Sequence, residues 1–142
     1  MKYAVCILAH KEPELLSRLV KKTVSDNTKI YVHLDKKSDI NDFLHIKDAK
    51  FIDSRVKVYW GGRSVVRAMY NLICEVVKDN ECDYLLFISG QDYPLVLPSE
   101  YDDIIDKSKN YIEYSALPRN DWFRGGLERI HYYYFFENKK NP

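Results

Sequence analysis

Four short stretches of polar and small residues carry the side chains best suited to chemistry in this sequence. Each one follows an apolar run: His10-Lys11, Asp35-Lys36, Trp60-Gly61-Gly62-Arg63 and Ser89-Gly90-Gln91-Asp92. Carboxylates accept hydrogen bonds from sugar hydroxyls, and glycine lets a ligand approach the backbone closely. These residue types therefore suit the binding of a sugar or a nucleotide.

Asp35 and His10 each allow two interpretations. Asp35 follows the apolar residues 30–34, where its carboxylate can accept hydrogen bonds from a ribose diol. It can equally be a solvated loop carboxylate paired with Lys36 or Lys37. His10 suits contact with a base or a phosphate, or a hydrogen bond to nearby backbone. Neither residue decides the chemistry alone.

Gly61-Gly62 precedes a predicted helix, whose backbone N–H groups and positive end can hold a phosphate. A tight turn between a strand and a helix needs the same glycines without any ligand. The sequence contains neither Gly-x-Gly-x-x-Gly nor Gly-x-x-x-x-Gly-Lys-Ser/Thr. That absence argues against a classical dinucleotide site and against a P-loop.

The segment Ser89–Leu95 is the most unusual one. Gly90 permits a sharp exit from a strand, and Asp92 places one carboxylate at that point. The alternative is a turn in which Asp92 bonds only its own backbone. Ser89 lacks the Gly-x-Ser-x-Gly pattern of a nucleophile. Because Gln91 and Tyr93 flank Asp92, no second carboxylate stands beside it to bind a metal ion.

Further candidates lie near the end of the sequence. Glu113 follows Tyr111-Ile112, and either receives a sugar hydroxyl or is a charge at a strand edge. Aromatic residues occur at Trp122-Phe123 and in the run Tyr132–Phe136. Their rings can stack on sugars, but such runs usually pack in a core.

The elements that must position these residues alternate along the sequence. Strands are predicted over 3–9, 29–34 and 84–88, with weaker candidates at 50–52, 56–60 and 111–115. Helices are predicted from Pro13, over 40–44, from a cap at Ser64 to Val77, and from a cap at Ser99 to Asp106. This order predicts an α/β fold with a parallel sheet and helices on both faces. Ligands bind beyond the carboxyl ends of such strands, where the four polar stretches would meet.

Composition limits the partners. The 142 residues hold 22 Lys and Arg against 21 Asp and Glu, and this net charge of +1 argues against nucleic acid. We expect one domain over residues 1–142. No apolar run approaches the roughly 20 residues of a membrane helix, and the first residues do not form a signal peptide. Three cysteines without Cys-x-x-Cys spacing favour reduced thiols in a cytosol, and four scattered histidines do not predict a zinc site.

The polar stretches, with their flanking strands, resemble the core-2/I-branching enzyme family. The resemblance runs from Tyr3 to about Arg129. It depends on four segments in order: His10-Lys11 after an apolar strand, Ile30–Lys37, Val58–Val66 and Ser89–Leu95. The family comprises inverting β-glycosyltransferases, among them β-1,6-N-acetylglucosaminyltransferases and peptide O-xylosyltransferases.

The resemblance implies a GT-A type, Rossmann-like fold and transfer of a sugar from a UDP-sugar, with no metal or other cofactor. Asp35 would lie near the nucleoside and Asp92 near the donor sugar, while Glu113 and Arg129 would face a glycan or another hydroxyl acceptor. The donor-binding residues expected by this resemblance are His10, Asp35, Trp60, Gly61, Ser89, Gly90 and Asp92.

Members of the family are longer, and their catalytic glutamate and diphosphate-binding basic residues lie in a later segment. We therefore expect this sequence to be the amino-terminal part of such an enzyme, inactive alone. By analogy it is a bacterial-type cytoplasmic enzyme of polysaccharide biosynthesis, with peripheral membrane association left open. Two alternatives are a non-catalytic nucleotide-sugar binding module and a glycoside hydrolase using Asp92 and Glu113, which needs carboxyl groups roughly 5 to 9.5 Å apart.

Overall fold

The computed structural model describes residues 1–106 and 108–132. The chain divides into two units, Met1–Asp106 and Lys107–Pro142. The expectation of a single domain over residues 1–142 stays a prediction.

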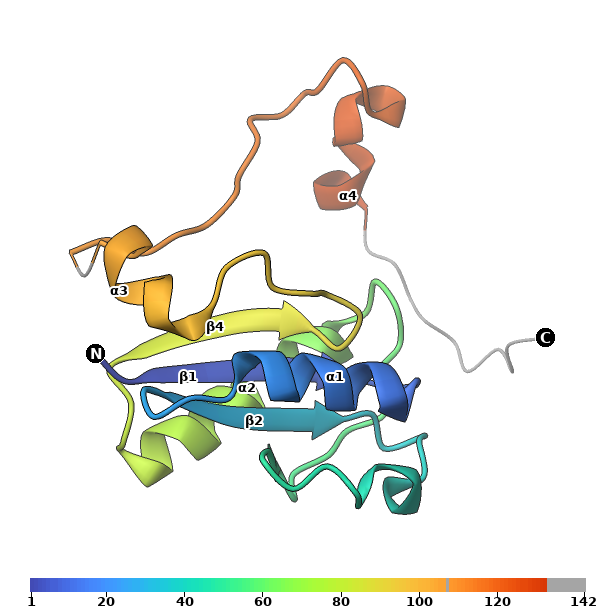
Figure 1. The fold of residues 1–142 in the computed structure, drawn as a ribbon. Coiled ribbons are helices and arrows are strands. Elements are labelled where there is room, and N and C mark those ends of the chain that lie inside the picture. The colour runs from blue at the N-terminus through green and yellow to red at the C-terminus, as the bar shows by residue number, and fades with distance from the viewer. Residues whose placement is uncertain (107, 133–142) are drawn as a thin grey trace. The chain divides into compact units, whose positions relative to one another are not determined.

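A four-stranded sheet forms the centre of the first unit (Figure 1). Its strands are β1 (Tyr3–Ala9), β2 (Thr28–Leu34), β3 (Lys50–Phe51) and β4 (Tyr84–Ser89), in the order β3-β2-β1-β4. Every pairing is parallel. β1 lies inside the sheet and is covered on both faces, which explains why its residues are continuously apolar.

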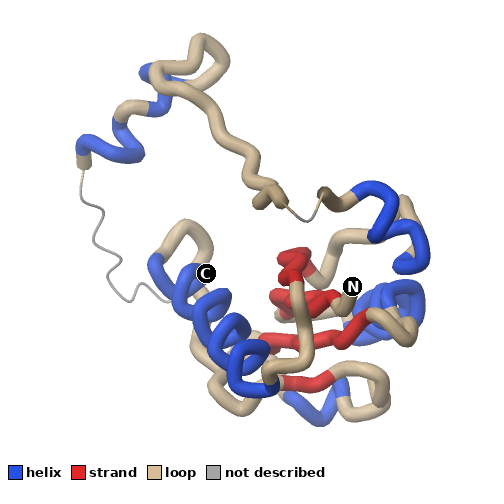
Figure 2. The backbone as a smooth tube through the Cα atoms, turned by 90° about the vertical axis from the view of Figure 1, so that its left-hand side faces the viewer, coloured by secondary structure: helices blue, strands red, loops and turns tan. Residues whose placement is uncertain are grey.

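Two helices cover the two faces of the sheet: α1 (Pro13–Thr23) and α2 (Arg63–Asp79). Figure 2 shows the strands nearly end-on, with helices on both sides. Pro13 stands in the first turn of α1, as predicted, because a proline there sacrifices no helical hydrogen bond. The predicted α/β, Rossmann-like fold with a parallel sheet and helices on both faces is confirmed.

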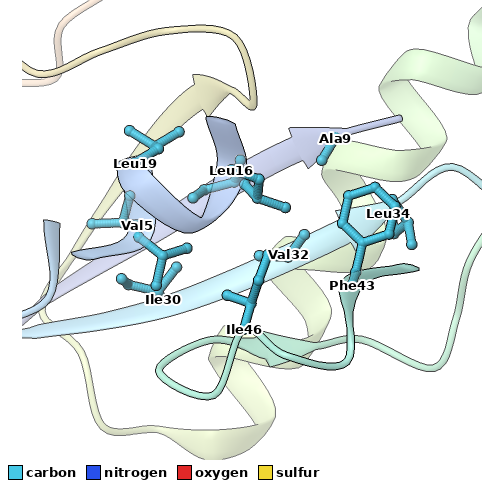
Figure 3. Packing of buried hydrophobic residues seen from close by; sticks show 11 residues of the cluster. Val5, Ala9, Leu16, Leu19, Ile30, Val32, Leu34, Phe43 and Ile46 are labelled. Atoms are coloured by element: carbon cyan, nitrogen blue, oxygen red, sulfur yellow. The ribbon is translucent and has the colours of Figure 1, made fainter. Parts of the chain in front are cut away.

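Alternate residues of β1 enter two separate cores. Val5, Ile7 and Ala9 pack with Leu16 and Leu19 of α1, and Figure 3 shows this cluster together with residues of β2 and of the segment between β2 and β3. Ala4 and Cys6 instead pack towards Leu72 and Val76 of α2. Both cores stop at the carboxyl ends of the strands, so polar residues that follow the strands lie at their border.

Shorter helical segments complete the described chain. They are η1 (Ile40–Phe43), η2 (Pro98–Glu100), α3 (Tyr101–Ile104), η3 (Phe123–Gly126) and α4 (Glu128–His131). Among the described residues no helix is both long and apolar enough to cross a membrane.

Several predicted elements were wrong. Residues 56–60 and 111–115 form irregular backbone instead of strands. In the first case side chains bind the backbone groups that a neighbouring strand would otherwise bind. The helix predicted up to Asp106 ends at Ile104. The cap of α2 is Gly62 and not Ser64, whose hydroxyl accepts a hydrogen bond from the backbone N–H of Tyr59.

Candidate functional site

Three strands end together at the carboxyl edge of the sheet. Ala9 pairs with Leu34, and Leu8 pairs with Ser89. The backbone N–H of Asp35 donates to the carbonyl of Ala9 at 2.8 Å, and that of Gly90 donates to the carbonyl of Leu8 at 2.8 Å. The structure therefore brings His10, Asp35 and Gly90 to one edge, as the sequence predicted.

Asp35 is buried, with 4% of its surface exposed, and its carboxylate holds two neighbouring segments. One oxygen, Oδ1, accepts the N–H of Lys37 at 2.8 Å. The other, Oδ2, accepts the N–H of Val58 at 3.4 Å and lies 3.5 Å from the Lys37 ammonium. The predicted pairing with Lys37 is present, but the carboxylate is not a solvated one. Two carboxylate oxygens offer about four acceptor positions, but a ligand hydroxyl can reach this group only through its small exposed surface.

Two residues at this edge were missed by the sequence analysis. His33 is buried, and its Nε2 accepts the N–H of Val56 at 3.0 Å, so that nitrogen carries no proton. Burial lowers the pKa of His33 and favours this neutral form. Arg55 donates to the carbonyls of Leu34, Asp35 and Ser38 at 2.9, 2.8 and 2.6 Å. For His33 a signal existed, because it stands two residues before Asp35 on the same strand face; for Arg55 there was none.

The turn before α2 carries the next predicted residues. Lys37 Nζ donates to the carbonyl of Val58 at 2.7 Å, which holds this turn near Asp35. Gly61 has a φ of 72°, a left-handed conformation that favours glycine. Trp60 is 96% exposed. No side chain caps α2 at Gly62, so a tight turn and an uncapped helix start occur together here.

Ser89 to Asp92 forms a hydrogen-bonded turn after β4. Asp92 Oδ2 accepts the N–H of Ser89 at 2.7 Å, and the Asp92 N–H donates to the Ser89 carbonyl at 3.0 Å. The Ser89 hydroxyl accepts the N–H of Gln91 at 3.2 Å. The turn predicted as the alternative for Asp92 is therefore present, while the residue itself stays exposed to solvent. A carboxylate held in this way is oriented and also accessible.

Gly90 permits the close contact between β4 and β1. A Cβ at this position would lie 3.0 Å from Ala9 Cβ and 3.3 Å from Ala9 Cα. Such distances are too short for ordinary packing. Gly90 was predicted to permit a sharp strand exit, and the structure adds this close packing against Ala9.

The second unit holds the two residues expected near an acceptor. Glu113 is exposed in irregular backbone. Arg129 belongs to α4, and its guanidinium lies 4.0 Å from the centre of the Trp122 ring. Arg119 lies 4.8 Å from the same ring and forms two hydrogen bonds to Asp121. Trp122 therefore orients arginines within this unit. Of the predicted aromatic run, Tyr132 is described and residues 133–136 lie outside the described residues.

The thiols of this chain are unpaired, and its described residues form no metal-binding cluster. All three cysteines are free, and burial raises the pKa of Cys6 to about 12. Over residues 1–106 and 108–132, no group of three or more His, Cys, Asp or Glu side chains is arranged to hold a metal ion.

Comparison with known proteins identifies the family of this chain. A search of curated proteins gave no match. The model of one family, described as Core-2/I-Branching enzyme, matches residues 4–139, which include every predicted site residue and all four strands of the sheet except Tyr3, the first residue of β1. This chain belongs to the Core-2/I-Branching enzyme family.

Proposed function

We propose that this glycosyltransferase binds a UDP-sugar at the carboxyl edge of its parallel sheet. The observation that supports the proposal most directly is the meeting of His10, Asp35 and Gly90 at that edge. Parallel α/β sheets bind their ligands at this place. In the proposed complex Asp35 accepts from the ribose, and His10 lies beside the nucleotide.

The turn residues contact the rest of the donor. Asp92 faces the donor sugar, because its carboxylate is accessible and already oriented by the Ser89 N–H. Trp60 and Gly61 stand just before α2, whose uncapped start offers backbone N–H groups to the diphosphate. Ser89 and Gly90, in the same turn as Asp92, complete the proposed donor contacts.

The proposed transfer inverts the anomeric centre and needs no metal ion. An acceptor hydroxyl attacks the anomeric carbon while the bond to UDP breaks, and a base takes the hydroxyl proton. Positive charge must stabilise the departing UDP. The donated sugar is N-acetylglucosamine or xylose, and Glu113 with Arg129 contacts the glycan or other hydroxyl acceptor. No residue of this chain is assigned as the base.

Calorimetric titration tests the donor site. UDP, UDP-N-acetylglucosamine and UDP-xylose are titrated into the chain with and without a chelator. We expect binding of UDP that a chelator does not change, and tighter binding of one of the two sugar nucleotides. Binding that requires a divalent cation would contradict the metal-independent mechanism, and no binding of any of the three would contradict the donor site.

A pair of matched variants locates the sugar contact. Asp92→Asn keeps an oxygen that can accept the Ser89 N–H but removes the charge, and we expect it to weaken UDP-sugar binding about tenfold. Asp26→Asn makes the same change at an exposed position before β2, at the other edge of the sheet, and should leave binding unchanged. Equal effects of the two variants would argue against a specific role of Asp92.

A further inference from the structure

We propose that His33 and Arg55 are positioning residues of the donor site. They fix residues 56–62, here called the 56–62 segment, against the end of β2. This segment carries Trp60 and Gly61, so its position sets their distance from Asp35. The proposed role rests on the proposed function, although neither residue needs to touch a substrate.

The first contact is between His33 and Val56. The His33 side chain is buried, with 1% of the residue exposed, and its Nε2 accepts the Val56 N–H at 3.0 Å. The Val56 carbonyl accepts the N–H of Lys36 at 3.1 Å. Val56 is therefore bound on both its backbone groups by residues of β2 and the turn after it. Without His33, its N–H would lose this partner in a partly buried position.

Arg55, the residue before Val56, also binds the end of β2. Its guanidinium donates to three carbonyls, those of Leu34, Asp35 and Ser38. The rigid, planar arrangement of guanidinium donors suits several fixed acceptors at once, which a lysine ammonium on a flexible stem does not reproduce. Arg55 thus joins the end of β2, the Asp35 backbone and the following turn into one rigid corner.

Further hydrogen bonds hold the rest of the 56–62 segment in place. The Val58 N–H donates to Asp35 Oδ2, and its carbonyl accepts from Lys37 Nζ. The Gly62 N–H donates to the Tyr59 carbonyl at 3.0 Å. The Ile52 N–H still donates to the Val32 carbonyl at 3.0 Å, but residues 53–58 belong to no strand, and side chains supply bonds that a sheet would otherwise give. Release of Val56 would therefore move Trp60 and Gly61 relative to Asp35.

Conservative and disruptive variants separate positioning from simple loss of stability. His33→Leu removes the acceptor for Val56, whereas His33→Gln offers an amide oxygen near the place of Nε2 and should restore function in part. Arg55→Lys keeps the charge but replaces the planar guanidinium, which bonds the three carbonyls through two of its nitrogens, by a single nitrogen on a flexible stem. The matched control is Tyr31→Phe, on the same strand, which removes the hydroxyl bonded to Asp79 at 2.9 Å, at the carboxyl end of α2.

Two measurements are made on the full chain: hydrogen exchange of the Val56 and Val58 amides, and calorimetric titration with UDP. We expect His33→Leu and Arg55→Lys to accelerate exchange of both amides and to weaken UDP binding, each about fivefold to tenfold, the change that one lost hydrogen bond produces. His33→Gln should lie between parent and His33→Leu. Tyr31→Phe should alter neither quantity, even if it lowers the melting temperature.

The two measurements give separable outcomes. Unchanged exchange at Val56 and Val58 in both His33→Leu and Arg55→Lys would overturn the proposal. Faster exchange with UDP affinity equal to that of Tyr31→Phe would overturn the positioning role. If the parent chain itself does not bind UDP, the proposed function and the donor-site role fail together, while the exchange rates still decide whether His33 and Arg55 fix the segment. If His33→Leu does not fold, Arg55→Lys decides.

Discussion

At the scale of single residues, Gly90 controls the approach of β4 to β1. A methyl group there would meet Ala9 Cβ at 3.0 Å, and the neighbouring backbone leaves it little room to shift. We expect Gly90→Ala to destabilise the fold by about 1–3 kcal/mol, the usual cost of overpacking. Urea unfolding measures this change.

A double variant identifies the cause of that loss. Ala9→Gly removes the atom nearest to the new methyl group, so Gly90→Ala combined with Ala9→Gly should be less destabilised than the sum of the single variants. Strict additivity of the two changes would mean that the contact with Ala9 is not the source of the effect.

How far the sequence predicts the site differs from residue to residue. Asp35 and Gly90 were predicted at the sheet edge, because each follows an apolar run that has the length of a buried strand. The burial of the Asp35 carboxylate was not predicted, since its partner Val58 lies 23 residues away and no local pattern links the two. For the same reason Arg55, which binds three carbonyls of distant residues, gave no signal.

At the scale of elements, an ionic network joins β2, β3 and α2. Asp79, at the end of α2, accepts hydrogen bonds from Lys50 and from the Tyr31 hydroxyl, and Lys29 lies 3.3 Å away. These contacts, chiefly the one with Lys50, lower the pKa of Asp79 to about 2. A carboxylate whose pKa is lowered by folding stabilises the folded state at any pH above its unfolded-state pKa. This contribution is lost as the pH falls towards the folded-state pKa.

The pH dependence of stability therefore tests this network. Between about pH 4 and pH 2 the parent should lose the contribution of Asp79, whereas Asp79→Asn should be less stable at pH 7 and decline less steeply over that interval. Urea unfolding at several pH values measures both effects, and Asp26→Asn serves as the control at an exposed carboxylate. Parallel curves for parent and Asp79→Asn would contradict this assignment.

Elements with strong periodicity were predicted better than those held by side chains. The repeat of apolar residues in α2 predicted a helix there correctly. Its start was predicted wrongly, with Ser64 as the cap, because serine is a common cap residue. The hydroxyl of Ser64 is used instead by the turn that contains Gly61. Residues 56–60 have the composition of a strand, yet the side chains of His33 and Asp35 bind their backbone, which composition cannot reveal.

At the scale of the whole molecule, the proposed donor site lies where both cores end, so ligand binding and folding should be coupled. A ligand that binds only the folded chain raises its unfolding free energy, by about 2.7 kcal/mol at a concentration one hundred times the dissociation constant. We therefore expect UDP to raise the melting temperature by several degrees in the presence of a chelator.

The same thermal experiment with uridine and with ADP measures separately what the diphosphate and the base of UDP contribute. Uridine lacks the diphosphate that the start of α2 would hold, and ADP lacks the base, so each should stabilise the chain less than UDP at equal concentration. The proposed contacts of Asp35 with ribose and of α2 with diphosphate together require UDP to exceed both. A melting temperature that rises equally with ADP and UDP would indicate a phosphate site without selection of the base, and a rise that disappears on addition of chelator would indicate a metal-bridged diphosphate.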